Sequence, residues 1–262
     1  MNNVVCIKYG RYYAPFYVNR LFAAVRRNLS RPFRFVCVTD NPEGLHPEVE
    51  YVPFSENPNV PGRKWPNIFS KLTLFKDGFA DLEGPTLYLD LDALITGPLD
   101  RFFDYRPGEF CIIRNWIEFY KRLFRAAPQI GNSSCFRFEA GASNAVYEFF
   151  LREKADPAKR HLFAKGSQKL QTRAMFSAGK VNWWPTDWVC SFKRQCVPPF
   201  PLNKFLAPRL PKGASIVAFH GRPDIPEAQV GYRFRRQDGR RVRVKPHLTC
   251  LPAPWIDTFW HE

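Results

Sequence analysis

The sequence predicts a single α/β domain with a mostly parallel central sheet flanked by helices. A strand, a helix and a second strand follow one another within about 40 residues at the start of the chain, which is the βαβ arrangement of parallel strands. Apolar runs continue to alternate with helical segments further along the chain. With 262 residues, of which 45% are hydrophobic, the chain is long enough to bury one large core.

The first βαβ unit is defined by two apolar runs and by signals for helix ends. Val4–Lys8 and Phe33–Val38 are short apolar runs typical of buried strands. Between them, Pro15–Leu29 has apolar residues at helical spacing, a proline in its first turn and two arginines in its last turn. These patterns predict two neighbouring parallel strands connected by a helix.

The rest of the chain alternates less regularly and is rich in proline-containing loops. Helices are predicted at Asn67–Phe75, Ala142–Arg152 and Gln168–Phe176. Strands are predicted at Thr86–Leu89, Phe110–Ile113, Ser134–Phe138, Val181–Trp184 and Ser215–Phe219.

The chain carries a strong excess of positive charge. Its 39 Lys and Arg residues against 24 Asp and Glu residues give a net charge of +15. This excess favours an anionic partner, namely nucleic acid, an anionic membrane surface or a phosphorylated substrate. Seven basic residues lie between Arg233 and Lys245, where they alternate around the turn dipeptide Asp238-Gly239 and predict a solvated β-hairpin.

Two features predict a cytoplasmic chain. No stretch reaches the roughly 18 consecutive apolar residues that a membrane-spanning helix needs, and the apolar run Val4–Ile7 is shorter than the core of an export signal.

The seven cysteines are odd in number and include no C-x-x-C pair. They therefore predict reduced thiols in the core rather than disulfides or a zinc site.

Two carboxylates at the end of an apolar run form the strongest candidate site. The apolar strand runs into Asp90 and Asp92 at positions i and i+2, so their side chains are expected to point to the same side, with roughly 7 Å between their Cα atoms. Buried carboxylates are costly unless a cation neutralises them, and Mn²⁺ or Mg²⁺ favours carboxylate and phosphate oxygens. The pair would lie at the carboxyl end of a strand, where α/β sheets bind ligands. The alternative is a solvated turn, in which Asp is common.

Three other strand ends carry polar residues that suit a nucleotide site. His220 ends an apolar strand and is either a hydrogen-bonded core histidine or a third metal ligand. Tyr9 and Gly10 end the first strand, where Tyr9 could stack on a base and Gly10 permits close approach of the backbone. Asp40 ends the second strand and either contacts the base or ribose or belongs to an ordinary turn.

Several segments together resemble one family. The run Leu87-Tyr88-Leu89-Asp90-Leu91-Asp92 resembles the D-x-D strand of GT-A glycosyltransferases, especially the galactosyltransferase/glycogenin-like, family 8-like group. Lys71 resembles the basic residue on the helix before that strand, and Asn132 is similar to the family's Asn that touches the donor sugar. Gln168 matches the second residue of an Asp-Gln pair, with Ser167 in place of the Asp. The segment Phe219-His220-Gly221-Arg222-Pro223 resembles the family's late His-x-x-Gly…Lys-Pro segment.

The resemblance implies a GT-A-like nucleotide-diphospho-sugar transferase fold in one domain. Residues 1–115 would form the nucleotide-binding half and residues 116–262 the acceptor side. The implied reaction is a metal-dependent hexosyl transfer, of the retaining type, from a nucleotide-sugar, expected to be UDP-linked, to a glycan or glycolipid such as a cell-envelope glycan. The residues concerned are Asp90, Asp92 and His220 for Mn²⁺ or Mg²⁺; Tyr9, Gly10, Asp40, Lys71, Asp90 and Arg222 for the donor; and Gln168 and Asn132 for catalysis.

Two other functions remain open from the sequence. A nucleotidyltransferase shares the α/β plan and the paired carboxylates, although the loop after the first strand is a poor phosphate cradle. A catalytically silent protein that binds nucleotide-sugars or polyanions fits Ser167 and the net charge of +15. The basic stretch Arg233–Lys245 adds the expectation of peripheral contact with the anionic inner face of the cell membrane, whereas nucleic acid is disfavoured as a partner.

Overall fold

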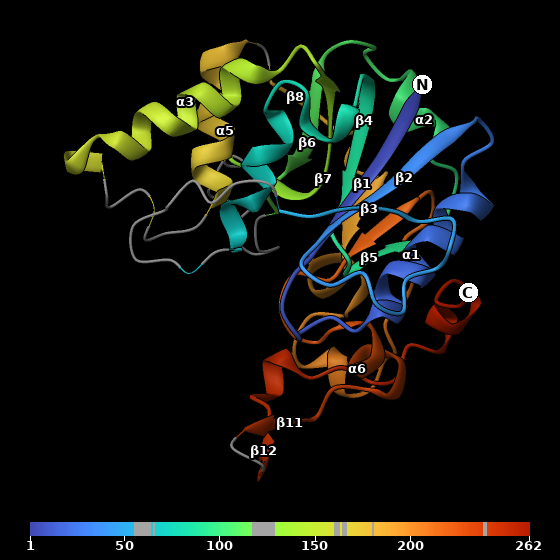
Figure 1. Ribbon diagram of the computed structural model, residues 1–262. Helices are drawn as coiled ribbons and strands as arrows, with labels where there is room; N and C mark the ends of the chain where they lie inside the picture. Colours follow the sequence, from blue (N-terminus) through green and yellow to red (C-terminus); the bar gives the residue numbers. More distant parts are fainter. Residues whose placement is uncertain are drawn as a thin grey trace.

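The computed structural model shows an α/β arrangement around a twisted sheet (Figure 1). It describes residues 1–54, 64, 66–116, 129–159, 163, 167–179, 181–237 and 240–262, and for residues 167–169, 177–178, 235–237 and 240–241 it describes the backbone alone.

The central sheet has seven strands in the order β3-β2-β1-β4-β7-β6-β8. Their bounds are β1 Asn2–Lys8, β2 Phe33–Thr39, β3 Glu50–Val52, β4 Gly84–Leu89, β6 Phe110–Arg114, β7 Gly131–Ala140 and β8 Val181–Trp183. β1 pairs in parallel with β2 and β4, β2 with β3, and β6 with β8. β7 runs antiparallel to both of its neighbours, β4 and β6. The predicted mostly parallel sheet is therefore confirmed.

A second sheet has three strands, and its first strand, β5, follows β4 in the chain. It has the order β5-β10-β9, with β5 Ala93–Ile95, β10 Ile216–Ala218 and β9 Val189–Ser191. β10 is antiparallel to β5 and parallel to β9. The predicted basic hairpin is also present, as β11 Phe234–Gln237 and β12 Arg240–Arg243. In Figure 1 the hairpin forms the lower tip of the molecule, far from α3.

Five α-helices and several short helices are described, and some of the α-helices lie beside the sheets. Their bounds are α1 Pro15–Asn28, α2 Asp100–Asp104, α3 Asn144–Ala155, α5 Ser167–Ala178 and α6 Ile225–Val230. Short 3-10 helices lie at Ile68–Phe75, Phe79–Asp81, Pro157–Lys159, Leu202–Lys204, Pro246–Leu248 and Pro254–Thr258, and a π-helix at Phe192–Cys196. Figure 1 shows α3 and α5 beside one another at the β8 end, and α1 near β5.

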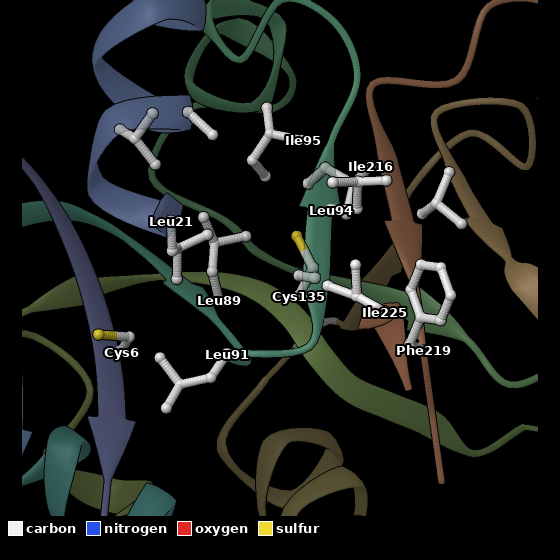
Figure 2. Close-up of a cluster of buried hydrophobic side chains, with 14 of the residues drawn as sticks. Cys6, Leu21, Leu89, Leu91, Leu94, Ile95, Cys135, Ile216, Phe219 and Ile225 are labelled. Carbon is white, nitrogen blue, oxygen red and sulfur yellow. The ribbon is translucent and has the colours of Figure 1, made fainter. Parts of the chain in front are cut away.

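Both faces of the central sheet are buried because side chains of β1 alternate between two apolar clusters. Val4 and Cys6 belong to a cluster that includes α1, β5 and β10, part of which Figure 2 shows. Val5 and Ile7 belong to a second cluster that includes α3, α5 and the 3-10 helix at Ile68–Phe75. All seven cysteines are buried and free, which confirms the expected core thiols.

The predicted elements are found within a few residues of their expected bounds, with two differences. The helix predicted at Asn67–Phe75 is a 3-10 helix, and it begins after Asn67, whose Oδ1 accepts a hydrogen bond from the backbone N–H of Phe69. The short elements β3, β5, β9, α2 and α6 were not predicted because three to six residues give too little periodicity. Among the described residues, no helix is both long and apolar enough to cross a bilayer.

Candidate functional site

A cavity of about 250 Å³ lies at the carboxyl ends of β1 and β4. It is lined by Ile7, Tyr9, Tyr12, Tyr13, Asn67, Ile68, Ser70, Lys71, Tyr88, Asp90, Leu91 and Asp92. All of these residues fall within the predicted nucleotide-binding half. One detail of the prediction is wrong: β4 ends at Leu89, so Asp90 and Asp92 lie in the turn between β4 and β5 and not on a strand. The turn nevertheless brings both carboxylates to the cavity wall.

Asp90 is held by three groups. Its Oδ1 is 2.6 Å from the Nζ of Lys71 and accepts a hydrogen bond of 2.8 Å from the hydroxyl of Tyr88. Its backbone N–H donates to the carbonyl of Ser134, which fixes the turn against β7. Lys71 also donates to the carbonyl and the hydroxyl of Ser133. The ammonium group of Lys71 therefore connects the 3-10 helix, the Asp90 turn and β7.

Asp92 lacks such a cation as a direct partner among the described residues. Its Oδ2 accepts a hydrogen bond of 3.1 Å from the hydroxyl of Tyr13. Burial, together with the negative charge of Asp90, raises the pKa of Asp92 from 3.8 to about 7, although the charge of Lys71 acts in the opposite direction. The two carboxylates therefore carry more negative charge than Lys71 neutralises, and a divalent cation would relieve this excess.

His220 follows Phe219, whose backbone N–H donates to the carbonyl of Asp92 at 2.9 Å, but the side chain of His220 has other partners. Its Nε2 is 2.6 Å from the Oγ of Ser191, and its ring stacks on Trp116 with 5.1 Å between the ring centroids. Burial, with the charges of Lys193 and Arg194, lowers the pKa of His220 to about 4, so the imidazole is neutral at pH 7. Among the described residues, no three His, Cys, Asp or Glu side chains are close enough to hold a metal ion. The two carboxylates fit a hard cation, whereas the part of His220 as third ligand remains a prediction.

Lys193 is a candidate that the sequence analysis missed. It lies on the π-helix after β9, and a Cβ built on Gly221 would be 3.4 Å from its Nζ. Burial is the main cause that lowers its pKa, while the charge of Asp92 raises it. No carboxylate of the described residues pairs with this half-buried ammonium group. Lys193 lies close to Gly221 and experiences the negative charge of Asp92 only because the chain folds these residues together. No local sequence pattern could therefore reveal it.

The remaining predicted nucleotide contacts are arranged in two ways. Tyr9 lines the cavity, and its stacking on a base remains a prediction. Gly10 and Asp40 do not line it, but they contact each other, because the backbone N–H of Gly10 donates to the Oδ2 of Asp40 at 2.9 Å. Arg222 is paired with Asp224 and Glu227, and its guanidinium lies 5.7 Å from the ring centroid of Tyr12, a residue of the cavity wall.

The two predicted catalytic residues lie on β7 and α5. Asn132 is buried, and its Oδ1 accepts a hydrogen bond from the backbone N–H of Ser134. Gln168 lies in the first turn of α5, and its side chain is outside the described residues. One turn later, the hydroxyl of Thr172 accepts a hydrogen bond from the backbone N–H of Gly131, next to Asn132. The structure thus brings the start of α5 to the end of β7 that carries Asn132.

Comparisons with known proteins agree on the fold. No protein-family model matches the chain, and no curated protein sequence matches it. Among solved structures, the galactosyltransferase LgtC, in complex with donor and acceptor sugar analogs, is similar at a TM-score of 0.52 and 15% identity, over 85% of this chain and 88% of LgtC. The bifunctional glycosyltransferase WbbM is similar at a TM-score of 0.59 and 11% identity, over 85% of this chain and 46% of WbbM.

A third similar structure is the glycosyltransferase GlyE of Streptococcus pneumoniae, with a TM-score of 0.56 and 11% identity over 86% of this chain and 56% of GlyE. The chain therefore spans about half the length of WbbM and GlyE and most of LgtC. The chain has the fold of GT-A glycosyltransferases and resembles LgtC in its architecture.

Proposed function

We propose that this chain is a metal-dependent glycosyltransferase that moves a sugar from a nucleotide-sugar, UDP-linked and with retention of configuration, to a glycan or glycolipid acceptor. One observation carries the proposal: Asp90, Asp92 and Lys71 meet in one cavity at the carboxyl ends of β1 and β4. Ligands of α/β sheets bind at such strand ends. The fold shared with glycosyltransferases supports the same reaction class.

In this proposal each residue acts on one part of the donor. Tyr9 stacks on the uracil, with Gly10 and Asp40 at the edge of the base and ribose. Asp90 and Asp92 would hold Mn²⁺ or Mg²⁺, which supplies positive charge to the diphosphate when bound. Preplaced ammonium and guanidinium groups stabilise the charge that develops on a leaving diphosphate.

Lys71 and Lys193 are the cations best placed for that task. Lys71 already contacts Asp90, and Lys193 is half-buried with no carboxylate partner among the described residues. Arg222 could join them only by leaving Asp224 and Glu227. Asn132 and Gln168 would contact the donor sugar, from β7 and the first turn of α5.

The proposal is tested by calorimetry with UDP, with and without Mn²⁺, and by hydrolysis assays on a set of UDP-sugars. We expect Mn²⁺ to strengthen UDP binding and at least one UDP-sugar to be hydrolysed. Asp90→Asn should abolish the effect of Mn²⁺, and Gln168→Ala should lower hydrolysis while UDP still binds. Asp187→Asn, a change of the same type at an exposed turn, is the matched control.

Three outcomes would contradict parts of the proposal. UDP affinity that a chelator leaves unchanged would exclude the metal role of Asp90 and Asp92. Binding without turnover of any donor would favour a silent nucleotide-sugar-binding protein. Release of pyrophosphate from a nucleoside triphosphate would identify a nucleotidyltransferase instead.

A further inference from the structure

A second cavity lies at the base of the basic hairpin. Figure 1 shows this hairpin at the lower tip of the molecule, far from α3. Its volume is about 460 Å³, and its wall includes Lys204, Arg233, Arg243, Phe234, Val244 and Asn203. Its lining residues all lie between 203 and 251, whereas those of the donor cavity lie between 7 and 92. The two cavities therefore share no residue.

The wall of this cavity is assembled from three separate segments. Phe234 of β11 is opposite Arg243 of β12, and the backbone N–H of Val244 donates to the carbonyl of Arg233. The amide nitrogen of Asn203 donates to the carbonyls of residues 246 and 249, which places its neighbour Lys204 beside the hairpin. The cations of the cavity thus come from both sides of the hairpin base.

Several polar groups of the cavity wall lack a hydrogen-bonding or charged partner among the described residues. No carboxylate of the described residues pairs with Lys204, Arg233 or Arg243. The Oδ1 of Asn203 is buried and has no hydrogen-bond partner among the described residues. A buried acceptor without a partner is uncommon in folded proteins and costs stability unless a ligand satisfies it. The cavity therefore suits a ligand with an anionic phosphate and a hydrogen-bond donor.

Exposed apolar side chains lie on the cavity wall or next to its lining residues in the sequence. Phe205, next to Lys204, is 75% exposed, and Leu202 and Leu248 are each 49% exposed. Phe234 itself is 42% exposed. Large apolar side chains beside cations that have no carboxylate partner are the combination that binds at a membrane–water interface, where the rings enter the headgroup region and the cations meet lipid phosphates.

We propose that this tip of the molecule docks on an anionic phospholipid bilayer, with a lipid headgroup in the cavity between Lys204, Arg233 and Arg243. The phosphate contacts the three cations, and a headgroup hydroxyl donates to the Oδ1 of Asn203. Phosphatidylglycerol has both groups and is the lipid to which the proposal commits. This inference is independent of the chemistry at Asp90 and Asp92.

Vesicle co-sedimentation of the full chain tests the proposal. The chain should bind vesicles of phosphatidylcholine mixed with phosphatidylglycerol, should not bind phosphatidylcholine alone, and should be released by salt. The double variant Arg233→Glu, Arg243→Glu should lose at least roughly tenfold in affinity, and Phe205→Ser should lose about threefold or more. The matched control Arg152→Glu, Arg173→Glu makes the same charge change on α3 and α5 and should keep vesicle binding.

Several results would overturn the proposal. Equal loss in the control variant would mean that net charge alone drives binding. Absence of binding to anionic vesicles, with binding of inorganic phosphate that the Arg233→Glu, Arg243→Glu variant loses, would assign the cavity to a soluble phosphate compound. Salt-dependent binding to DNA in the absence of vesicle binding would assign the surface to nucleic acid.

Discussion

At the scale of single residues, the donor cavity concentrates charge that the fold does not balance. Asp90 has Lys71 as a partner, while Asp92 has a tyrosine hydroxyl. A buried carboxylate without a cation destabilises a folded protein when it ionises. Such a site is expected where ligand binding, rather than folding, requires the charge.

The first prediction concerns Asp92 and pH. Its pKa in the folded chain is raised from 3.8 to about 7, so the folded state holds this proton more tightly than the unfolded state. The associated stability is present below about pH 4 and is lost as the pH rises through 7. In the presence of a chelator, Asp92→Asn should therefore stabilise the protein by about 1–2 kcal/mol at about pH 8 and by little at about pH 4.

Urea unfolding of both proteins at the two pH values measures this difference. Asp187→Asn at an exposed turn should show no such pH dependence. If Asp92→Asn destabilises the protein equally at both pH values, the carboxylate has a structural role through the hydroxyl of Tyr13 instead.

The second prediction concerns Lys193. If its unpaired ammonium group contacts the donor diphosphate, Lys193→Met should weaken UDP binding in the presence of Mn²⁺ by about tenfold, because a charge-assisted hydrogen bond is lost. Its melting temperature should not fall, since the variant removes a half-buried charge. Calorimetry against the exposed control Lys212→Met measures the effect, and equal affinities for UDP would place Lys193 outside the site.

At the scale of elements, an irregularity between β6 and β7 shapes the site. The register between these strands shifts between Ile112 and Ile113, which leaves residues 133–135 without partners on β6. Within this stretch, the carbonyl of Ser133 accepts a hydrogen bond from Lys71, and the carbonyl of Ser134 accepts one from the backbone N–H of Asp90. A β-bulge is a common means of directing residues towards a site, and here the irregular stretch of β7 contacts both Lys71 and Asp90.

The third prediction tests the packing that holds this bulge. A Cβ on Gly131 would lie 2.5 Å from the Cδ1 of Ile112, which is buried. Gly131→Ala should therefore destabilise the protein by about 1–3 kcal/mol through overpacking. Ile112→Val removes the clashing Cδ1, so the double variant should be more stable than the sum of the two single changes predicts. Additive free energies of unfolding would show that the strands move apart without strain.

At the scale of the whole molecule, the C-terminal segment closes the core against α1. Trp260 is 3% exposed and lies 5.4 Å from the ring of Tyr17, between ring centroids. Arg27 of α1 donates to the carbonyls of Phe259 and His261. The segment at residues 259–261 therefore packs on α1, the first helix of the chain.

The fourth prediction follows from this closure. Trp260→Ala should lower the free energy of unfolding by about 3–5 kcal/mol, because it removes a large buried ring. Phe205→Ala, which truncates a ring that is 75% exposed, should change it little. Chemical denaturation of the two variants makes the comparison. A small effect of Trp260→Ala would mean that the C-terminal segment adds little to the core.

The local elements and part of the site could be predicted from neighbouring residues in the chain. Apolar periodicity and end signals predicted β1, α1 and β2, and hydrophobic runs predicted β4 and β10, because these depend on neighbouring residues. The spacing of Asp90 and Asp92 after an apolar run predicted the carboxylate pair, and Tyr9, which was expected to stack on the base, lines the same cavity.

The tertiary structure alone decided how distant segments meet. Lys193 approaches Gly221, Lys71 reaches Ser133, and Asn203 bonds to the loop that follows β12, and each contact joins residues far apart in the chain. No periodicity encodes such contacts, because they follow from sheet order, the bulge in β7 and the crossing of loops. For the same reason, the sequence could predict a basic hairpin at Arg233–Lys245 but not the cavity at its base.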